Sequence, residues 1–158
     1  MPVIVNFHKK YAFLSLEDKF EVTYKGIKFS NLKRLYAASR FHSLDMIYLC
    51  ADDEQCSDVE INYFCNYVTS GTLVTSRFEQ GHFNILCDIL KLKFTQEPYR
   101  TKLLETGDAT LINLTRGQPK LGKFKGQGED LLGRALMTVR DELRNTSEVK
   151  LNTTSKED

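Results

Sequence analysis

The chain has 158 residues, 41% of them hydrophobic and 27% charged, which is the composition of one globular domain. Its 22 basic and 21 acidic side chains leave a formal net charge of +1, so bulk electrostatics gives no reason to expect binding to nucleic acid or to an anionic membrane. No stretch approaches the roughly 20 apolar residues of a membrane span, and the N-terminal apolar run is too short for a signal peptide. We therefore expect a cytoplasmic protein.

Short strands are predicted near the N-terminus, because apolar and polar residues alternate there. The alternating segments are residues 2–7, 20–24 and 27–29. Lys25 and Gly26 separate the second segment from the third, and a glycine at this place favours the positive φ of a tight turn. The sequence therefore predicts one isolated strand followed by a hairpin. Residues 109–114 are expected to form a further short extended segment.

Helices are predicted from apolar spacing and from residues that start or stop a helix. The clearest stripe contains Phe83, Leu86 and Leu90. Asn31 or the serine before it can cap the first helix, and Pro98 favours the start of another. The predicted helices span residues 31–40, 58–68, 83–94, 98–106 and 129–144. The remainder of residues 42–80 shows no clear pattern.

The order of these elements indicates the fold class. Strands and helices do not alternate regularly, which argues for an α+β fold rather than a wound parallel sheet. We predict one mainly helical domain over residues 1–145, with a few short N-terminal strands. Residues 146–158 are polar and are expected to form a flexible tail.

The cysteines and histidines give no sign of a metal site. Cys50, Cys56, Cys65 and Cys87 lack the C-x-x-C spacing and the paired histidines of a zinc site. We therefore expect reduced, buried or half-buried thiols, with no metal and no cofactor. No nucleophile–histidine pair and no pair of carboxylates stands out, so no catalytic residue is assigned.

A glycine- and lysine-rich segment, residues 116–128, is the most suggestive local feature. Its glycines would let backbone N–H groups approach an anion, and the helix expected after Gly128 adds positive potential. A phosphate or an ADP-ribose-like ligand could bind there, although the order of a P-loop is missing. The alternative is a mobile surface loop. Lys33 and Arg34 likewise offer a contact to a phosphate or a partner, or else a solvated helix face.

Several motifs in this sequence resemble those of a known family. Residues 93–98 read KFTQEP and residues 103–108 read LLETGD, similar to a KF-x-Q-N-P … LL-x-TG run. Residues 128–140, GEDLLGRALMTVR, look like a closing G-Q-N-x-LG-x-x-LM-x-VR signature. Both patterns are those of the NADAR (YbiA-like) family, which the chain resembles from about residue 10 to residue 144. Weaker matches lie at residues 11–15, 24–29 and 36–41.

The resemblance implies a YbiA-like fold and a ligand. Proteins of this family bind ADP-ribose-like or phosphoribosyl compounds, and some cleave N-glycosidic bonds. That cleavage develops positive charge on the sugar, which carboxylates stabilise. The candidate ligand-binding residues are Lys33, Arg34, Tyr36, Lys93, Phe94, Gly122, Phe124, Gly128 and Asp130.

The chain departs from the family pattern at positions that would carry this chemistry. Lys33 and Arg34 stand where the family usually has Glu and His, so an ammonium replaces a carboxylate. Leu121 stands where the family has a tryptophan, and a stacking platform is missing unless Phe124 substitutes. Further departures at polar positions are Leu16, Asn113 and Asp130.

These departures lead to the hypothesis of a retained scaffold that has lost catalysis. Such a protein would act by binding a nucleotide, an ADP-ribose-like ligand or a protein partner. One alternative is an active N-glycosidase that removes ADP-ribose or cleaves a phosphoribosyl bond. Its acid would then come from Glu105, Asp108, Glu129 or Asp130. Another alternative is a small viral or mobile-element effector that binds a host protein.

Overall fold

Helices make up most of the chain in the computed structural model, which describes residues 2–5 and 7–157, with side chains up to residue 146. The elements in chain order are β1 (Val3–Ile4), the 3-10 helix η1 (Lys9–Leu14), β2 (Val22–Tyr24), β3 (Ile27–Phe29), α1 (Leu32–Ala38), α2 (Leu44–Ala51), α3 (Asp58–Tyr67), α4 (Ser76–Phe94), α5 (Tyr99–Glu105), β4 (Thr110–Leu111) and α6 (Leu131–Glu157). The predicted α+β class, mainly helical with short strands, is therefore confirmed.

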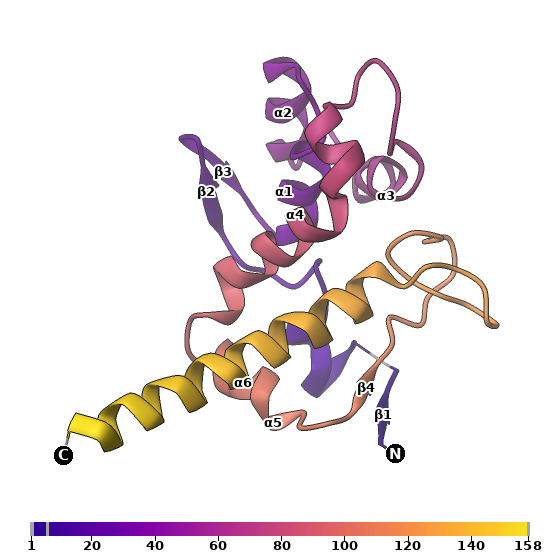
Figure 1. Cartoon of the computed structure of the whole chain (residues 1–158). Helices are drawn as coiled ribbons and strands as arrows, with labels where there is room; N and C mark the ends of the chain where they lie inside the picture. The colour runs from indigo at the N-terminus through magenta and orange to yellow at the C-terminus, as the bar shows by residue number, and fades with distance from the viewer. Residues whose placement is uncertain (1, 6, 158) are drawn as a thin grey trace.

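The strands pair in two small sheets within the described part of the chain. β1 runs parallel to β4, so the start of the chain lies beside the segment that follows α5 (Figure 1). β2 and β3 form the predicted antiparallel hairpin. Lys25 (φ 53°) and Gly26 (φ 77°) both have left-handed φ at its turn, as a type I′ turn requires. β1 is shorter than the predicted strand over residues 2–7.

Helix α1 packs against α2, α3 and α4. Asn31 caps it as predicted, because its side-chain oxygen accepts a hydrogen bond from the backbone N–H of Arg34 at 2.9 Å. Every residue of α1 is buried, including its two cationic residues. Cations in such a place must be neutralised by groups from the surrounding elements. The position of α1 therefore determines what Lys33 and Arg34 can do.

Helices α4 and α6 pack against each other, and Figure 1 shows α6 running past α5. α6 buries the stripe predicted for it, namely Leu132, Ala135, Leu136, Val139 and Leu143. It begins at Leu131 rather than at residue 129, because Asp130 has a left-handed φ of 48°. It also continues past the predicted end at residue 144 to Glu157. Residues 146–157, predicted to form a flexible tail, thus continue this helix, their flexibility stays a prediction, and Asp158 lies outside the described residues.

The sequence pattern misses α2 and the first part of α4. Ser43 caps α2 through the N–H of Met46, and every residue of this helix except Asp45 is apolar, so no single apolar stripe stands out in the sequence. In α4, Gly81 has a non-helical φ of −135°. This kink separates the first turns from the predicted stripe that begins at Phe83. None of the described helices is both long and apolar enough to span a membrane.

Candidate functional site

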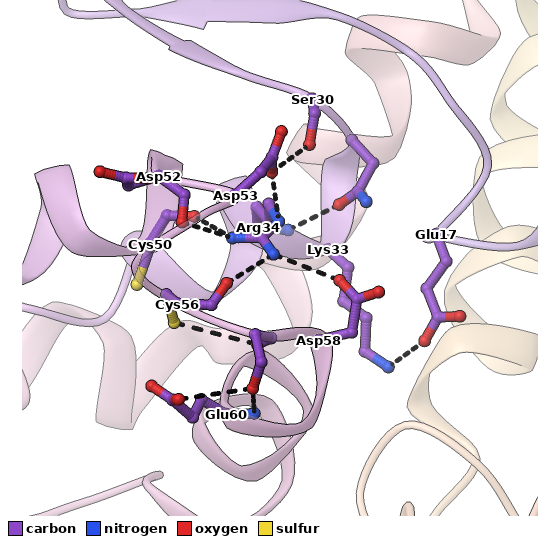
Figure 2. A network of polar contacts seen from close by, with 12 residues as sticks. Glu17, Ser30, Lys33, Arg34, Cys50, Asp52, Asp53, Cys56, Asp58 and Glu60 are labelled. Atoms are coloured by element: carbon purple, nitrogen blue, oxygen red, sulfur yellow. Dashed lines mark hydrogen bonds and ion pairs between the residues drawn. The ribbon is translucent and has the colours of Figure 1, made fainter.

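Lys33 is the centre of the candidate site, and its side chain is only 5% exposed. Its Nζ lies 2.6 Å from Glu17 Oε1, 2.8 Å from Asn62 Oδ1 and 3.4 Å from Gln118 Oε1. An ammonium has three hydrogen-bond donors, and these three acceptors match them. Figure 2 shows the Lys33 side chain extending to Glu17. The charge of Lys33 is therefore neutralised within the protein.

A cavity of about 90 Å³ remains beside Lys33. Leu16 and Asn113, two positions at which the chain departs from the family pattern, line this cavity together with Lys33. Asn113 Nδ2 also donates to the backbone oxygen of Leu121 at 3.1 Å. Leu121 is a third position at which the chain departs from the family pattern. The fold thus brings four of the sequence departures together. We name this cavity, with Leu16, Glu17, Lys33, Asn113 and Gln118, the Lys33 pocket.

Arg34 is fixed by a different network, which Figure 2 shows in full. Its Nε lies 2.9 Å from Asp53 Oδ1, and its two terminal nitrogens donate to backbone oxygens and to Asp58. The backbone acceptors are those of Cys50 (3.1 Å), Asp52 (3.4 Å) and Cys56 (2.7 Å). All five N–H groups of the guanidinium are engaged. Arg34 therefore holds the connection between α2 and α3, and the donors of its guanidinium are used within the protein.

Backbone amides of the glycine- and lysine-rich segment are already bonded within the protein. The N–H groups of Lys120 and Leu121 both donate to Asn66 Oδ1, at 3.1 and 3.0 Å. The next two amides donate to the backbone oxygens of Gln118 and Asn113. A segment predicted as a flexible anion-binding loop is thus tied to α3 and to the segment that follows β4. These four N–H groups are not free to bind a phosphate.

Two of the predicted ligand-binding glycines have a packing role. A Cβ on Gly122 would lie 2.6 Å from Thr115 Cγ2 and 2.9 Å from the backbone oxygen of Asn113. A Cβ on Gly128, whose φ is 114°, would lie 2.4 Å from the backbone oxygen of Gly122. Both glycines therefore allow backbone segments to approach each other closely.

Asp130 occupies the N-terminal end of α6. Its Oδ1 accepts hydrogen bonds from the backbone N–H groups of Asn113 (3.1 Å) and Gly133 (3.2 Å). Burial raises the pKa of this carboxyl above its ordinary value, although the two backbone hydrogen bonds act in the opposite direction. The helix end that was predicted to attract an anionic ligand therefore holds a carboxylate of the protein itself.

Tyr36 lies on α1 but lines a second cavity, of about 180 Å³. Glu79, His82 and Lys120 line the same cavity. Burial raises the pKa of the Tyr36 phenol well above its ordinary value. Lys33 and Tyr36, predicted as parts of one site, thus belong to separate cavities.

Lys93 and Phe94 serve the packing of η1 against α4. Lys93 Nζ donates to the backbone oxygen of Phe13 at 2.9 Å and pairs with Asp18 Oδ2 at 3.1 Å. It also lies 4.8 Å from the ring centroid of Tyr99. Burial lowers the pKa of Lys93, and the hydrogen bond to Asp18 partly offsets this effect. Phe94 is 1% exposed and packs edge-on against Phe13.

Phe124 is half-buried, and cations already lie against its ring. The Arg116 guanidinium is 4.6 Å and the Lys125 ammonium 5.6 Å from the ring centroid. Such contacts use the face that a base would stack on. Phe124 lines neither of the two cavities described so far.

Three of the four acids considered for a relocated active site have other contacts, and those of Asp130 are described above. Asp108 pairs with Arg144 at 3.1 Å, and Glu129 pairs with Lys120 at 2.6 Å. None of Glu105, Asp108, Glu129 and Asp130 lines the Lys33 pocket or the Tyr36 cavity.

Among the residues that the structure describes, no three His, Cys, Asp or Glu side chains come together as a metal site.

The sequence pattern does not reveal the partners of Lys33. Glu17 comes from the segment after η1, Asn62 from α3 and Gln118 from the glycine-rich segment. Asn62 also donates to the backbone oxygen of Gly117 at 3.1 Å, so it joins Lys33 to that segment. Of these three partners, only Glu17 could have been suspected from the sequence. It is an acidic residue next to Leu16, a position at which the chain departs from the family pattern.

Comparison with known proteins bears on the fold. The NMR structure of the E. coli protein YbiA matches this chain with a TM-score of 0.75 at 18% sequence identity, over 92% of this chain and 87% of YbiA. No protein-family profile matches the chain, and no curated protein matches its sequence. The resemblance indicated by residues 93–108 and 128–140 is therefore confirmed in three dimensions: the chain has a YbiA-like fold.

Proposed function

We propose that this chain is a non-catalytic protein of YbiA-like fold that acts by binding a protein partner. The observation that carries the proposal is the closed ion-pair network of Lys33. Cleavage of an N-glycosidic bond needs a carboxylate near the sugar, where positive charge develops. The position that aligns with the family's glutamate holds an ammonium, and its nearest carboxylate, Glu17, pairs with it at 2.6 Å.

The size and chemistry of the Lys33 pocket also argue against a nucleotide ligand. Its volume is about 90 Å³, whereas pockets for ligands of drug or cofactor size hold roughly 300–1,000 Å³. The donors that would hold phosphates, namely the Lys33 ammonium and the amides of Lys120 and Leu121, are bonded internally. A protein partner needs no such pocket, so it is the binding target that we favour.

Turnover assays test the loss of catalysis. The full chain is incubated with ADP-ribosylated guanine nucleic acid and with phosphoribosyl pyrimidine intermediates, and the released products are separated by chromatography. We expect no release above that of a heat-denatured sample. Release by the native chain that disappears in Glu17→Gln or in Glu79→Gln, a variant of the Tyr36 cavity, would overturn the proposal.

Calorimetry tests the alternative of a nucleotide ligand. ADP-ribose is titrated into the full chain and into Lys33→Glu. We expect no binding heat in either titration, because the Lys33 charge is already neutralised. Binding to the native chain that weakens in Lys33→Glu would instead favour capture of an ADP-ribose-like ligand in the Lys33 pocket.

A further inference from the structure

A groove lies between the β2–β3 hairpin and helices α1, α2 and α4. It consists of two adjoining cavities of about 310 and 290 Å³, which share residues of the hairpin, α1 and α2. In Figure 1 the hairpin stands beside α1 and α2, away from α6. The floor of the groove is apolar, with Leu35, Phe41, Ile85 and Ile89 among the lining residues. We call this feature the hairpin groove.

Large apolar side chains at the edge of the hairpin groove stay exposed. Tyr24 of β2 is 41% exposed, Leu44 of α2 63% and Leu92 of α4 41%, and all three line the groove. They come from three different elements and line the same groove as the apolar residues of its floor. Exposed apolar side chains gathered around a groove in this way mark interaction sites on proteins.

The charges of the hairpin groove are mainly positive. Lys25 at the hairpin turn and Arg77 in the first turn of α4 line it, and both are exposed. Neither forms a salt bridge with another residue of the described part of the chain. Asp88, the acidic residue that lines the groove, lies 3.9 Å from Lys91, which is itself closer to Glu142, at 2.6 Å. The groove therefore presents two exposed cations without an ion-pair partner in the described part of the chain, against one carboxylate, beside an apolar floor.

We propose that the hairpin groove binds an amphipathic segment of a partner protein, whose carboxylates lie beside its apolar side chains. This inference rests on the proposed function and specifies the surface and the partner's chemistry. Electrostatic complementarity with Lys25 and Arg77 selects an acidic segment, and the apolar floor takes its apolar side chains. A segment several turns long covers Leu44 and Leu92 together, whereas a small ligand in one cavity leaves one of them exposed.

A peptide selection tests the proposal with defined probes. A displayed library of random peptides of about 16 residues, long enough to present an apolar stripe, is selected against the full chain. The enriched peptides are synthesised, and their binding is measured by fluorescence anisotropy. We expect peptides that combine Asp or Glu with apolar residues at helical or alternating spacing.

Matched variants locate the binding. Arg77→Glu places a carboxylate in the first turn of α4, where the helix dipole tolerates it, and Leu92→Ser removes an exposed apolar contact. We expect each to weaken peptide binding about tenfold, the effect of losing roughly 1.4 kcal/mol. Two control variants are expected to leave peptide binding unchanged. Lys19→Glu makes the same charge change at an exposed residue outside the groove, and Val59→Ser replaces an exposed apolar residue of α3. Circular dichroism verifies that each variant is folded.

The outcomes separate this inference from the proposed function. The inference is overturned if no peptide is enriched, if the enriched peptides lack carboxylates, or if Arg77→Glu and Leu92→Ser bind as tightly as the native chain. Turnover of a glycosidic substrate with groove binding intact would overturn the proposed function alone. Absence of both turnover and groove binding would overturn the inference alone.

Discussion

The ammonium of Lys33 and the carboxylate of Glu17 lie 2.6 Å apart and join α1 to the segment after η1. The backbone strengthens the same junction, because the N–H of Lys33 donates to the oxygen of Leu16 at 3.1 Å. The Glu17 side chain is 58% exposed and that of Lys33 only 5%. Water can therefore replace Lys33 as a partner of Glu17, but it cannot readily replace Glu17 as a partner of Lys33.

Replacing Glu17 by glutamine is expected to destabilise the fold. Glu17→Gln leaves a buried ammonium with neutral acceptors, so the free energy of unfolding should fall by about 1–3 kcal/mol. Urea unfolding followed by circular dichroism measures this change. Glu21→Gln is the matched control, because it breaks an exposed ion pair with Lys28 that should contribute about 0–1 kcal/mol. Equal losses in the two variants would contradict a structural role for the Glu17 pair.

Replacing Arg34 by lysine keeps the positive charge, but it should still lower the stability of the fold considerably. A lysine has three donors in place of five, so backbone oxygens of the α2–α3 connection lose their partner. We expect Arg34→Lys to lower the free energy of unfolding by about 2–4 kcal/mol. Arg77→Lys, at an exposed position, should change it by less than about 0.5 kcal/mol. A functional rather than structural Arg34 would leave stability unchanged in both variants.

The elements that the sequence predicts well are those with a local cause. The hairpin follows from alternation around Gly26, the α1 cap from Asn31, and the packing of α6 from a regular apolar stripe. The start of α6 is misplaced because Asp130 adopts a left-handed φ, which aspartate takes only in some contexts. α2 is missed because all of its residues except Asp45 are apolar, so no single face stands out in the sequence. Local sequence patterns thus predict those elements that bury one clear apolar face.

The candidate site is harder to predict because its contacts are distant in sequence. Lys33 meets Glu17, Asn62 and Gln118, which are 16, 29 and 85 residues away. Alignment with family motifs identifies Lys33 as a departure from the pattern, but it cannot show that the charge is neutralised. Gly122 and Gly128 are predicted from the sequence to bind a ligand, whereas the structure gives both a role in the close packing of backbone segments.

Gly122 offers a direct test of that packing role. In Gly122→Ala the new methyl group would lie 2.6 Å from Thr115 Cγ2 and 2.9 Å from the Asn113 oxygen, so the free energy of unfolding should fall by about 1–3 kcal/mol. Gly81→Ala is the control, since a Cβ there meets no atom within 4 Å and the φ is negative. Thermal and urea unfolding of both variants measure the difference. Equal stability of the two would exclude tight packing around Gly122.

The thiols provide a prediction on reactivity. All four cysteines are free and buried, and burial raises the pKa of Cys50 to about 12 and that of Cys87 to about 11. Few thiolates exist at pH 8 in the folded protein, so reaction with Ellman's reagent should be slow until urea unfolds the chain. A thiol that reacts rapidly in the native protein would contradict this burial.

Asp130→Asn should stabilise the protein at neutral pH. An asparagine keeps an oxygen for the N–H groups of Asn113 and Gly133 and tolerates a left-handed φ. Burial raises the pKa of Asp130 above its ordinary 3.8. The Asp130 carboxyl therefore stays protonated in the folded protein over a pH range in which it is ionised in the unfolded chain. Its contribution to stability is therefore greatest below the pKa of the unfolded chain and is lost as pH rises through the folded-state pKa.

Urea unfolding of the native chain and Asp130→Asn between pH 3 and pH 7 measures this effect. The advantage of the asparagine variant should grow as pH rises from the ordinary pKa of 3.8, because only the native chain must then bury a charge. Lys123 and Arg134 favour the charged form, but burial is the larger effect. An advantage that is constant with pH would show that the backbone hydrogen bonds, together with these two cations, offset the cost of burying the carboxylate.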